Sequence, residues 1–215
     1  MHRYDMNAFF SRSSDVVAED HELFRALDRL PTLTPTGPWL AGGALRRTLS
    51  RTPLDSDFDF FFASAEQFAS FCEGLKARGG WKISENEHNV TFRLPSKAPE
   101  PTGQDEFSAY EPELTIQAIN TTYYPTLEAV LDSFDFTLCQ FGYDGADLVC
   151  GDYALWDLGR KRLVTHRITY GTASLRRLLK YTRQGFTACG GSLSEFLEKV
   201  ASEPSVINRE TLYID

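Results

Sequence analysis

Apolar residues recur at helical spacing in several segments of the chain. The first is residues 14–30, where Ser14 is placed to cap the first turn. Leu23, Leu27 and Leu30 then fall on one face of that helix. The same periodicity predicts helices over residues 14–30, 44–49, 64–78, 125–131, 153–158, 174–186 and 192–200.

Shorter segments alternate between apolar and polar residues, or are apolar throughout, which is typical of strands. A hairpin turn at Asp144-Gly145 joins two of them. The predicted strands cover residues 39–41, 57–62, 81–86, 89–94, 113–119, 135–143, 148–150 and 162–166. Residues 96–112 are rich in proline, glycine and polar residues, which predicts either a lid or a loose loop.

Composition limits the domain organisation. A chain of 215 residues with a hydrophobic fraction of 42% fits one large domain, or one domain with a small appendage. The composition shifts near residue 168, after which arginine and lysine become frequent. We therefore expect a head domain over residues 1–168 and a helical extension over residues 169–215. The net charge of −8 argues against a broadly basic nucleic-acid surface.

The sequence contains no sign of a membrane or secreted protein. No apolar run approaches the length of a membrane span, and the first residues lack a signal-peptide core. The cysteines are far apart and do not cluster with histidines, so we expect reduced thiols and no zinc site; they are Cys72, Cys139, Cys150 and Cys189. These features predict a soluble, cytoplasmic protein without a membrane partner.

Two glycines follow the short strand 39–41 and precede a predicted helix. Such a turn exposes backbone N–H groups at the helix N-terminus, where phosphate can bind. Arg46 lies in the first turn of this helix, within reach of phosphate oxygens. Gly42, Gly43 and Arg46 are therefore candidate phosphate ligands, although a glycine pair alone is more often a simple tight turn.

Asp57 and Asp59 alternate within the aromatic strand that follows. Alternate residues share one face of a strand, so the two carboxylates are expected side by side. Such a pair repels itself unless a cation offsets the charge, and carboxylate oxygens are ligands of Mg²⁺ and Mn²⁺. A solvated edge strand is the alternative, but the surrounding phenylalanines indicate a packed strand. Asp55 follows the same spacing, but Pro53 favours a loop there.

The segment GGALRR…DSDFDFFF resembles the nucleotidyltransferase superfamily with a DNA polymerase β-type palm. It is similar to the head domain of class II tRNA nucleotidyltransferases (CCA-adding enzymes) and bacterial poly(A) polymerases, whose pattern is GGxxR followed by DxD. The resemblance extends, in the family's order, through residues 133–145, 154–166 and 174–186. It implies an α/β (α+β) fold with a mixed sheet, flanking helices and a short C-terminal helical extension. It also implies nucleotide or phosphate contacts at Asp135, Arg176 and Lys180.

The chain departs from the family pattern in three ways. Arg47 stands where the family usually has Asp, and the paired arginines before Asp135 are replaced. The nucleotide-selecting EDxxR signature is not found, so complete CCA addition is not expected. The superfamily usually adds a third carboxylate from a neighbouring strand, which binds metal or activates the attacking hydroxyl. In strand 113–119 this place falls to Glu113, at its start, or to Gln117, at its centre, and an amide is a poor base.

We therefore expect a metal-dependent nucleotidyltransferase that moves NMP from an NTP, such as ATP, to an acceptor. Asp57, Asp59 and Glu113 would be catalytic, and Asp57 and Asp59 would hold Mg²⁺ or Mn²⁺. The acceptor expected first is RNA with a tRNA-like 3′ end, and a protein hydroxyl or a small molecule is the alternative.

Other functions are compatible with the same residues. The first alternative is a nucleotide- or RNA-binding module of the same fold with weak or no catalysis, which Gln117 favours. The second is a phage-encoded interaction protein that acts on a host factor through its acidic surface. A basic helical stripe at Arg176, Lys180 and Arg183 would contact RNA or a triphosphate, or would be a solvated helix face. A phosphohydrolase would need a water-activating base that the sequence does not identify.

Overall fold

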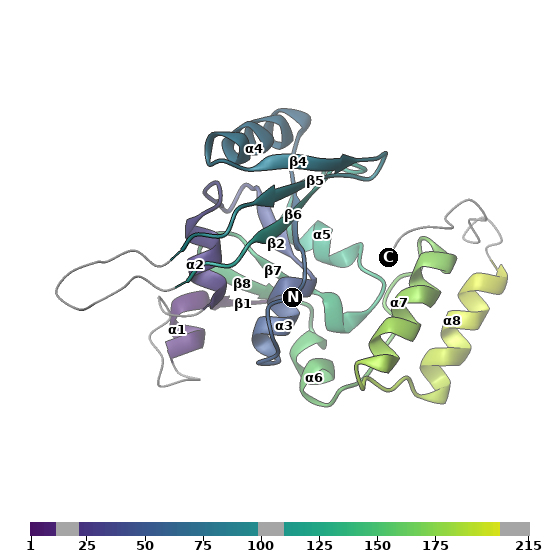
Figure 1. Cartoon of the computed structure of the whole chain (residues 1–215). Coiled ribbons are helices and arrows are strands. Elements are labelled where there is room, and N and C mark those ends of the chain that lie inside the picture. The colour runs from purple at the N-terminus through teal and green to yellow at the C-terminus, as the bar shows by residue number, and fades with distance from the viewer. Residues whose placement is uncertain (12–21, 99–109, 203–215) are drawn as a thin grey trace.

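The computed structural model describes residues 1–11, 22–98 and 110–202, and one mixed β-sheet runs through these segments (Figure 1). Its strands follow the order β1-β8-β7-β2-β3-β6-β5-β4. β3 and β6 are parallel, and the other neighbours are antiparallel. The strand bounds are β1 His2–Asp5, β2 Trp39–Ala41, β3 Phe58–Phe61, β4 Trp81–Glu85, β5 Asn89–Leu94, β6 Leu114–Ile119, β7 Phe141–Tyr143 and β8 Asp147–Cys150.

Helices flank this sheet, and two of them begin at the polar caps that the sequence offers. The Ser64 hydroxyl accepts the N–H of Gln67 at the start of α4, and Thr126 caps α5 in the same way. The helices are α1 Met6–Ser11, α2 Glu22–Asp28, α3 Gly43–Leu49, α4 Ala65–Ala77, α5 Leu127–Asp132, α6 Ala154–Gly159, α7 Gly171–Arg183 and α8 Gly190–Ser202, with a 3-10 turn η2 at Thr137–Cys139. The predicted fold class, an α/β (α+β) fold with a mixed sheet and flanking helices, is confirmed.

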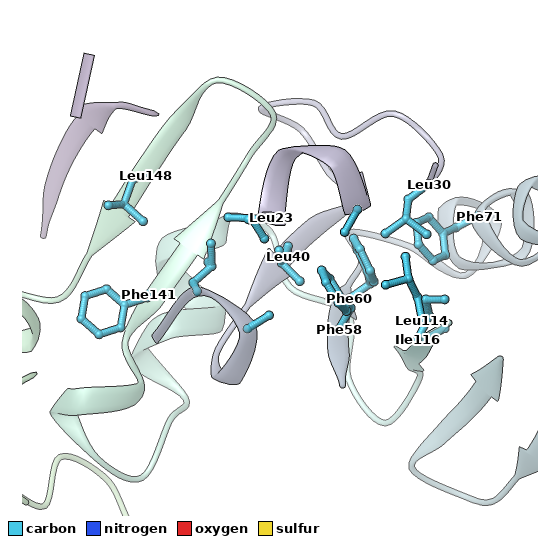
Figure 2. Packing of buried hydrophobic residues seen from close by; sticks show 14 of the residues in the cluster. Leu23, Leu30, Leu40, Phe58, Phe60, Phe71, Leu114, Ile116, Phe141 and Leu148 are labelled. Carbon is cyan, nitrogen blue, oxygen red and sulfur yellow. The ribbon is translucent and has the colours of Figure 1, made fainter. Parts of the chain in front are cut away.

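The central strand β3 has one face covered by α2, α3 and α4. Phe58 and Phe60 point to this face, and both are fully buried. Figure 2 shows them beside Phe71 of α4 and Ile116 of β6, and the ring centroids of Phe60 and Phe71 lie 4.6 Å apart. Burial of each ring stabilises the fold by roughly 2–3 kcal/mol, so these alternate aromatic residues fix which way β3 faces.

The opposite face of the sheet packs against α5. Trp39 of β2 and Phe61 of β3 form a second core with Leu127, Val130 and Leu131 of this helix. By the alternation of side chains along a strand, Asp57 and Asp59 lie on the same face as Phe61. The two acids therefore lie on the face of the sheet that α5 covers, next to this second hydrophobic core.

The prediction of a continuous strand over residues 135–143 is wrong in its first half. Thr137 begins the 3-10 turn η2, because its N–H donates to the Val164 carbonyl and its hydroxyl to Asp157 Oδ2 at 2.6 Å. These bonds to a following loop replace ladder bonds. The strand β7 therefore covers Phe141–Tyr143 alone within this segment.

The strand predicted over residues 162–166 is also wrong. This segment makes isolated bridges, from Arg162 to Thr187 and from Thr165 to Phe136. The His166 N–H donates to the Asp135 carbonyl, so the backbone of this segment ties loops together instead of extending the sheet.

The edge strand β1 and helix α1 are not predicted from the sequence. β1 is polar and mostly exposed, and it pairs with β8. Arg3 donates to Asp144 at 2.8 Å, Asp147 at 3.2 Å and Glu128 at 2.9 Å. This strand is held by ion pairs and backbone hydrogen bonds to distant parts of the sequence. Its own pattern of apolar and polar residues therefore does not predict a strand.

Two predictions fall partly outside the described residues. Of the helix predicted over residues 14–30, the structure describes α2 and the turn that follows it, and residues 14–21 lie outside. Of the loop predicted over residues 96–112, residues 99–109 lie outside. At its base, Lys97 and Glu111 form a β-bridge.

The C-terminal helices α7 and α8 lie side by side at one end of the molecule (Figure 1). Tyr181 and Phe186 pack against the main core, and Phe196 of α8 packs on Ile168 and Leu178. The division of the chain at residue 168 stays a prediction. No helix in the described part of the chain is long and apolar enough to cross a membrane.

Two of the five glycines that have a positive φ in the described residues allow a test of the fold. Gly79 has a φ of 82°, and an added Cβ would meet no atom within 4 Å. Gly145, in the β7–β8 hairpin, has a φ of 95°, and an added Cβ would overlap the Leu33 carbonyl oxygen. Gly79→Ala should lower the free energy of unfolding by about 1 kcal/mol, from strained backbone alone. Gly145→Ala should lower it by about 3 kcal/mol, because a backbone clash is added. Urea denaturation measures both, and equal losses would contradict the described packing of the hairpin on Leu33.

Candidate active site

The two aspartates predicted as metal ligands lie at the start of β3. Asp59 is placed between Ala41 of β2 and Gln117 of β6 by the register of the sheet. Asp57 precedes the strand by one residue, and both carboxylates are partly buried. The predicted strand brings the two acids to one face, because Phe58 between them is buried on the other side.

The glycine turn lies directly against these acids. Gly42 has a φ of 88° and a ψ of −123°, a conformation that other residues rarely adopt. A Cβ built at Gly42 would lie 3.8 Å from Asp59 Oδ2, in ordinary van der Waals contact, so the turn lies directly beside the carboxylate. The Gly42 N–H is already bonded to the Phe141 carbonyl at 2.9 Å. Gly43 is the first residue of α3, so its backbone N–H has no carbonyl acceptor within the helix. It is therefore the next backbone N–H at this turn that could donate to a ligand.

Ser56 is a site residue that the sequence analysis misses. It lies against the turn, since a Cβ at Gly43 would be 3.6 Å from the Ser56 hydroxyl oxygen. That oxygen is buried and has no hydrogen-bond partner among the described residues. A buried hydroxyl without a partner is unfavourable unless a ligand completes its bonding. A serine in a loop carries no sequence signal. Ser56 is identified only by the packing of the loop before β3 against the start of α3.

Burial raises the pKa of the Asp59 carboxyl to about 7, and the charge of Asp57 adds to the rise. Arg177 and Lys180 oppose it with positive charge. Near neutral pH the Asp59 carboxyl is therefore divided between its protonated and ionised forms, and a cation that binds beside it displaces a proton.

Helix α7 supplies the positive charge that faces the acids. Lys180, a predicted contact residue, is one of these cations, and Arg177 is the other. The predicted contacts of Arg176 and Lys180 with nucleotide or RNA stay predictions. Arg177 is held by an ion pair with the buried carboxylate of Asp135. Asp135 thus positions a cation, and its predicted contact with nucleotide stays a prediction.

The place of the third carboxylate is taken by an amide. Gln117 lies opposite Asp59 in the parallel ladder, and its Nε2 donates to Asp57 Oδ2 at 2.5 Å. Asn89 Nδ2 donates to Gln117 Oε1 at 3.3 Å, and this orients the amide. The structure does not bring Glu113 to the acids. It lies four residues before Gln117, about 13 Å along the strand, and pairs with Arg93 at 3.1 Å.

Arg46 is also absent from the acid pair. Its guanidinium lies 5.0 Å from the ring centroid of Tyr181 and 5.6 Å from that of Phe186, and it is buried. Its position in the first turn predicts reach toward a phosphate, but the helix turns it toward α7 instead. Arg47, where the family usually has Asp, pairs with Asp55 at 2.6 Å. Asp55 is therefore a loop residue with a cation partner, outside the β3 face.

The donor set fits a divalent cation that arrives with a nucleotide. Magnesium is held in such sites by one or two carboxylates together with substrate phosphates and water. Asp57 and Asp59 supply the carboxylates, and the partnerless Ser56 hydroxyl faces the same turn. In the described part of the chain, no group of three or more His, Cys, Asp or Glu side chains converges on one point. The chain therefore supplies part of a coordination shell.

Comparison with known proteins identifies both a family and a fold. The model of the family described as "Gad2: Gabija anti-defense 2 family protein" matches residues 5–161, most of the chain. Comparison with curated proteins finds no significant match.

Among solved structures, CCA-adding enzymes are similar to this chain. The complex of such an enzyme with CTP gives a TM-score of 0.58 at 16% identity, with 96% of this chain and 48% of that chain covered. A complex with ATP gives 0.56 at 17% identity, with 96% and 48% covered. The Thermotoga maritima enzyme complexed with tRNA gives 0.55 at 16% identity, with 94% and 46% covered. At these identities the likeness shows a nucleotidyltransferase-like fold, and this chain spans about half the length of those enzymes.

Because the pKa of Asp59 is raised, removing this carboxyl is expected to increase the stability of the fold by an amount that depends on pH. The folded protein holds a proton on this carboxyl up to about pH 7, whereas the unfolded chain loses it near pH 4. Stability is therefore lost as the pH rises from about 4 to about 7. The free energy of unfolding of Asp59→Asn should exceed that of wild type by about 4 kcal/mol at pH 8, with little difference at pH 4.

The matched control is Asp55→Asn, which removes an exposed carboxylate next to Arg47. Chemical denaturation without divalent cations, repeated from pH 4 to pH 8, measures both variants. A gain for Asp59→Asn that stays constant with pH would contradict the described burial of this carboxyl.

Proposed function

This chain belongs to the Gabija anti-defense 2 family, and we propose that it is a metal-dependent nucleotidyltransferase whose product counteracts Gabija defence. The observation that carries the proposal is the arrangement at β3. Two adjacent carboxylates, Asp57 and Asp59, lie against a glycine turn and face the cations Arg177 and Lys180 across the site. A Mg-NTP has the complementary charge distribution, with a cation for the acids and phosphates for the turn and the basic helix.

Each part of the site has a distinct task in this proposal. Asp57 and Asp59 hold Mg²⁺ or Mn²⁺, which stabilises negative charge at the reacting phosphate. The Gly43 N–H and the Ser56 hydroxyl donate hydrogen bonds to phosphate oxygens at the turn. Arg177 and Lys180 face the pyrophosphate that leaves when an acceptor hydroxyl attacks the α-phosphate. Asp59 releases its proton as the cation binds, so that productive binding strengthens as the pH rises toward 7.

The similar structures support the proposed reaction more strongly than they support a particular acceptor. The structural neighbours include a CCA-adding enzyme complexed with tRNA, which supports an RNA 3′ end. The family name supports an acceptor that matters to Gabija defence, either an RNA or a protein of that system. We propose RNA as the first candidate acceptor. We also propose that this protein is encoded by a phage and acts in the cytoplasm.

Label transfer tests the proposed reaction. The protein is incubated with each α-³²P-labelled NTP, Mg²⁺ or Mn²⁺, total RNA and lysate from cells that express Gabija. Label should enter one acceptor class, and Asp57→Asn/Asp59→Asn should reduce the rate by at least about 10³-fold, because charge stabilisation of the transition state is lost.

Asp55→Asn is the matched control, since it removes a carboxylate from the loop that leads to the same strand. It should label at the wild-type rate. Equal labelling by the control and the Asp57/Asp59 double variant, or no label from wild type with any nucleotide, would refute the proposed reaction for these acceptors.

A second candidate function rests on Gln117. An amide in the place of the third carboxylate favours a module that binds Mg-NTP or RNA and counteracts the defence by interaction rather than by catalysis. In that case the fold keeps the acid pair for binding, and turnover is lost together with the third acid.

Gln117→Glu distinguishes the two candidates. If the chain is a binding module, wild type binds Mg-NTP without labelling any acceptor, and Gln117→Glu gains activity. If the chain is the proposed enzyme, wild type labels the acceptor, and Gln117→Met lowers the rate because Asp57 loses its donor. Labelling by wild type would rule out the binding module, whatever the rate of Gln117→Glu.

A further inference from the structure

An aromatic ring borders the acid site at the glycine turn. A Cβ built at Gly42 would lie 3.8 Å from Asp59 Oδ2 and 3.9 Å from Phe134 Cζ. The tip of the ring and the carboxylate therefore both lie next to the position that this glycine leaves without a side chain. Phe134 itself is partly exposed. The site thus has an apolar group beside its charged one, and the proposed catalytic steps do not use it.

The backbone on both sides of this ring is anchored. The Phe134 N–H donates to the Leu131 carbonyl at 3.3 Å, just after the end of α5. The next residue, Asp135, pairs with Arg177, and its carbonyl accepts the His166 N–H at 2.7 Å. A ring that is held in place before a ligand arrives loses little freedom when the ligand binds, so its contact with the ligand is favourable.

Packing of the second hydrophobic core is the competing explanation for this ring. Phe134 lies against Phe61, with the ring centroids 5.7 Å apart and the planes at 59°. However, core members such as Trp39 and Val130 are fully buried, whereas Phe134 packs against this core and stays partly exposed. The core accounts for the contact with Phe61, and part of the ring is left open to a ligand.

The polar side chains nearest the acids are engaged with one another. Gln117 donates to Asp57 and accepts a hydrogen bond from Asn89. Asp135 holds Arg177. Side chains that identify a base by its edge need donors and acceptors that are not already in use, whereas an aromatic face stacks on a base without them. Among these groups, the ring is the one suited to a contact with a base.

We propose that Phe134 is the platform on which the base of the nucleotide stacks, and that the site therefore accepts all four NTPs. This inference rests on the proposed binding of Mg-NTP at Asp57 and Asp59, and it states how the base of that nucleotide is bound. With the metal and the phosphates at the acids and the turn, the base lies one sugar away and meets the ring beside Gly42. Every base has an aromatic face, so stacking tolerates all of them.

This mode of binding limits how strongly the site selects a base. The four NTPs should bind to wild type with affinities that differ by less than about tenfold, because they differ only in how well they stack. A site that reads hydrogen bonds on the substrate rejects an analogue without them by about 10⁴-fold or more. Titration of each NTP in Mg²⁺ measures this selectivity, and a preference above about 10²-fold for one NTP would overturn the inference.

The contact itself is tested by removing the ring and the base separately and together. Wild type and Phe134→Leu are titrated by calorimetry, without acceptor, with Mg-ATP and with Mg-ribose 5′-triphosphate, which lacks only the base. Wild type should bind ATP at least about fivefold more tightly than ribose triphosphate. Phe134→Leu keeps apolar bulk but has no ring, so it should bind both ligands with the affinity that wild type has for ribose triphosphate.

Tyr124→Leu is the matched control. The Tyr124 ring also packs on Phe61, with the centroids 6.2 Å apart, but its N–H bonds to the Phe62 carbonyl, at the opposite end of β3 from Asp57. This variant should keep the wild-type preference for ATP over ribose triphosphate. If Phe134 has only a structural role, Phe134→Leu weakens both ligands to the same extent or neither, and the inference is overturned.

The same measurements separate this inference from the proposed reaction. Absence of label transfer, with the ATP preference present in wild type and lost in Phe134→Leu, would refute catalysis and leave the platform in place. Label transfer by wild type, with equal binding of ATP and ribose triphosphate, would refute the platform alone. If neither ligand binds to wild type, the metal–nucleotide site is refuted and the platform with it.

Discussion

The repulsion between two carboxylates on one strand face is the constraint around which the functional end of this molecule is built. Asp57 and Asp59 are held together because Phe58 and Phe60 must be buried on the other face of β3. Their charge then has to be offset. The structure does this in three ways, with a proton on Asp59, an amide donor from Gln117, and cations from α7. The charge of the pair is thus partly offset without a metal, and a cation that binds beside Asp59 displaces its proton.

This need for positive charge explains why α7 packs where it does. The helix contributes a modest apolar surface to the core, mainly through Leu178 and Tyr181. Its position is also fixed by the Arg177–Asp135 ion pair and by the stacking of Arg46 on Tyr181. An ion pair with a buried carboxylate is sensitive to geometry, so it determines the orientation of α7 more strictly than apolar contact could.

The sequence predicted the fold class and the acid pair because both depend on short-range pattern. Alternating aromatic residues define β3, and the glycine pair defines the turn that leads into α3. What could not be predicted depends on register and helix phase. The position of Gln117 opposite Asp59, of Ser56 against Gly43 and of Arg177 near Asp59 each depends on how two elements are placed relative to one another. The polar edge strand β1 is likewise held by hydrogen bonds from Arg3 to Asp144 and Glu128. These carboxylates are far away in the sequence, so the local pattern of residues does not predict the strand.

The assembly of the site also constrains how the protein forms in the cell. Asp59 and the arginine that faces it are separated by 118 positions, and the parallel β3–β6 pair encloses α4 and a hairpin between its strands. Such high contact order makes folding slow, and it delays the full charge balance of the acid pair until α7 has left the ribosome. A nascent chain therefore carries the acids without their cations. If the chain binds nucleotide as proposed, it acquires this ability late in synthesis, in one step with the docking of the C-terminal helices.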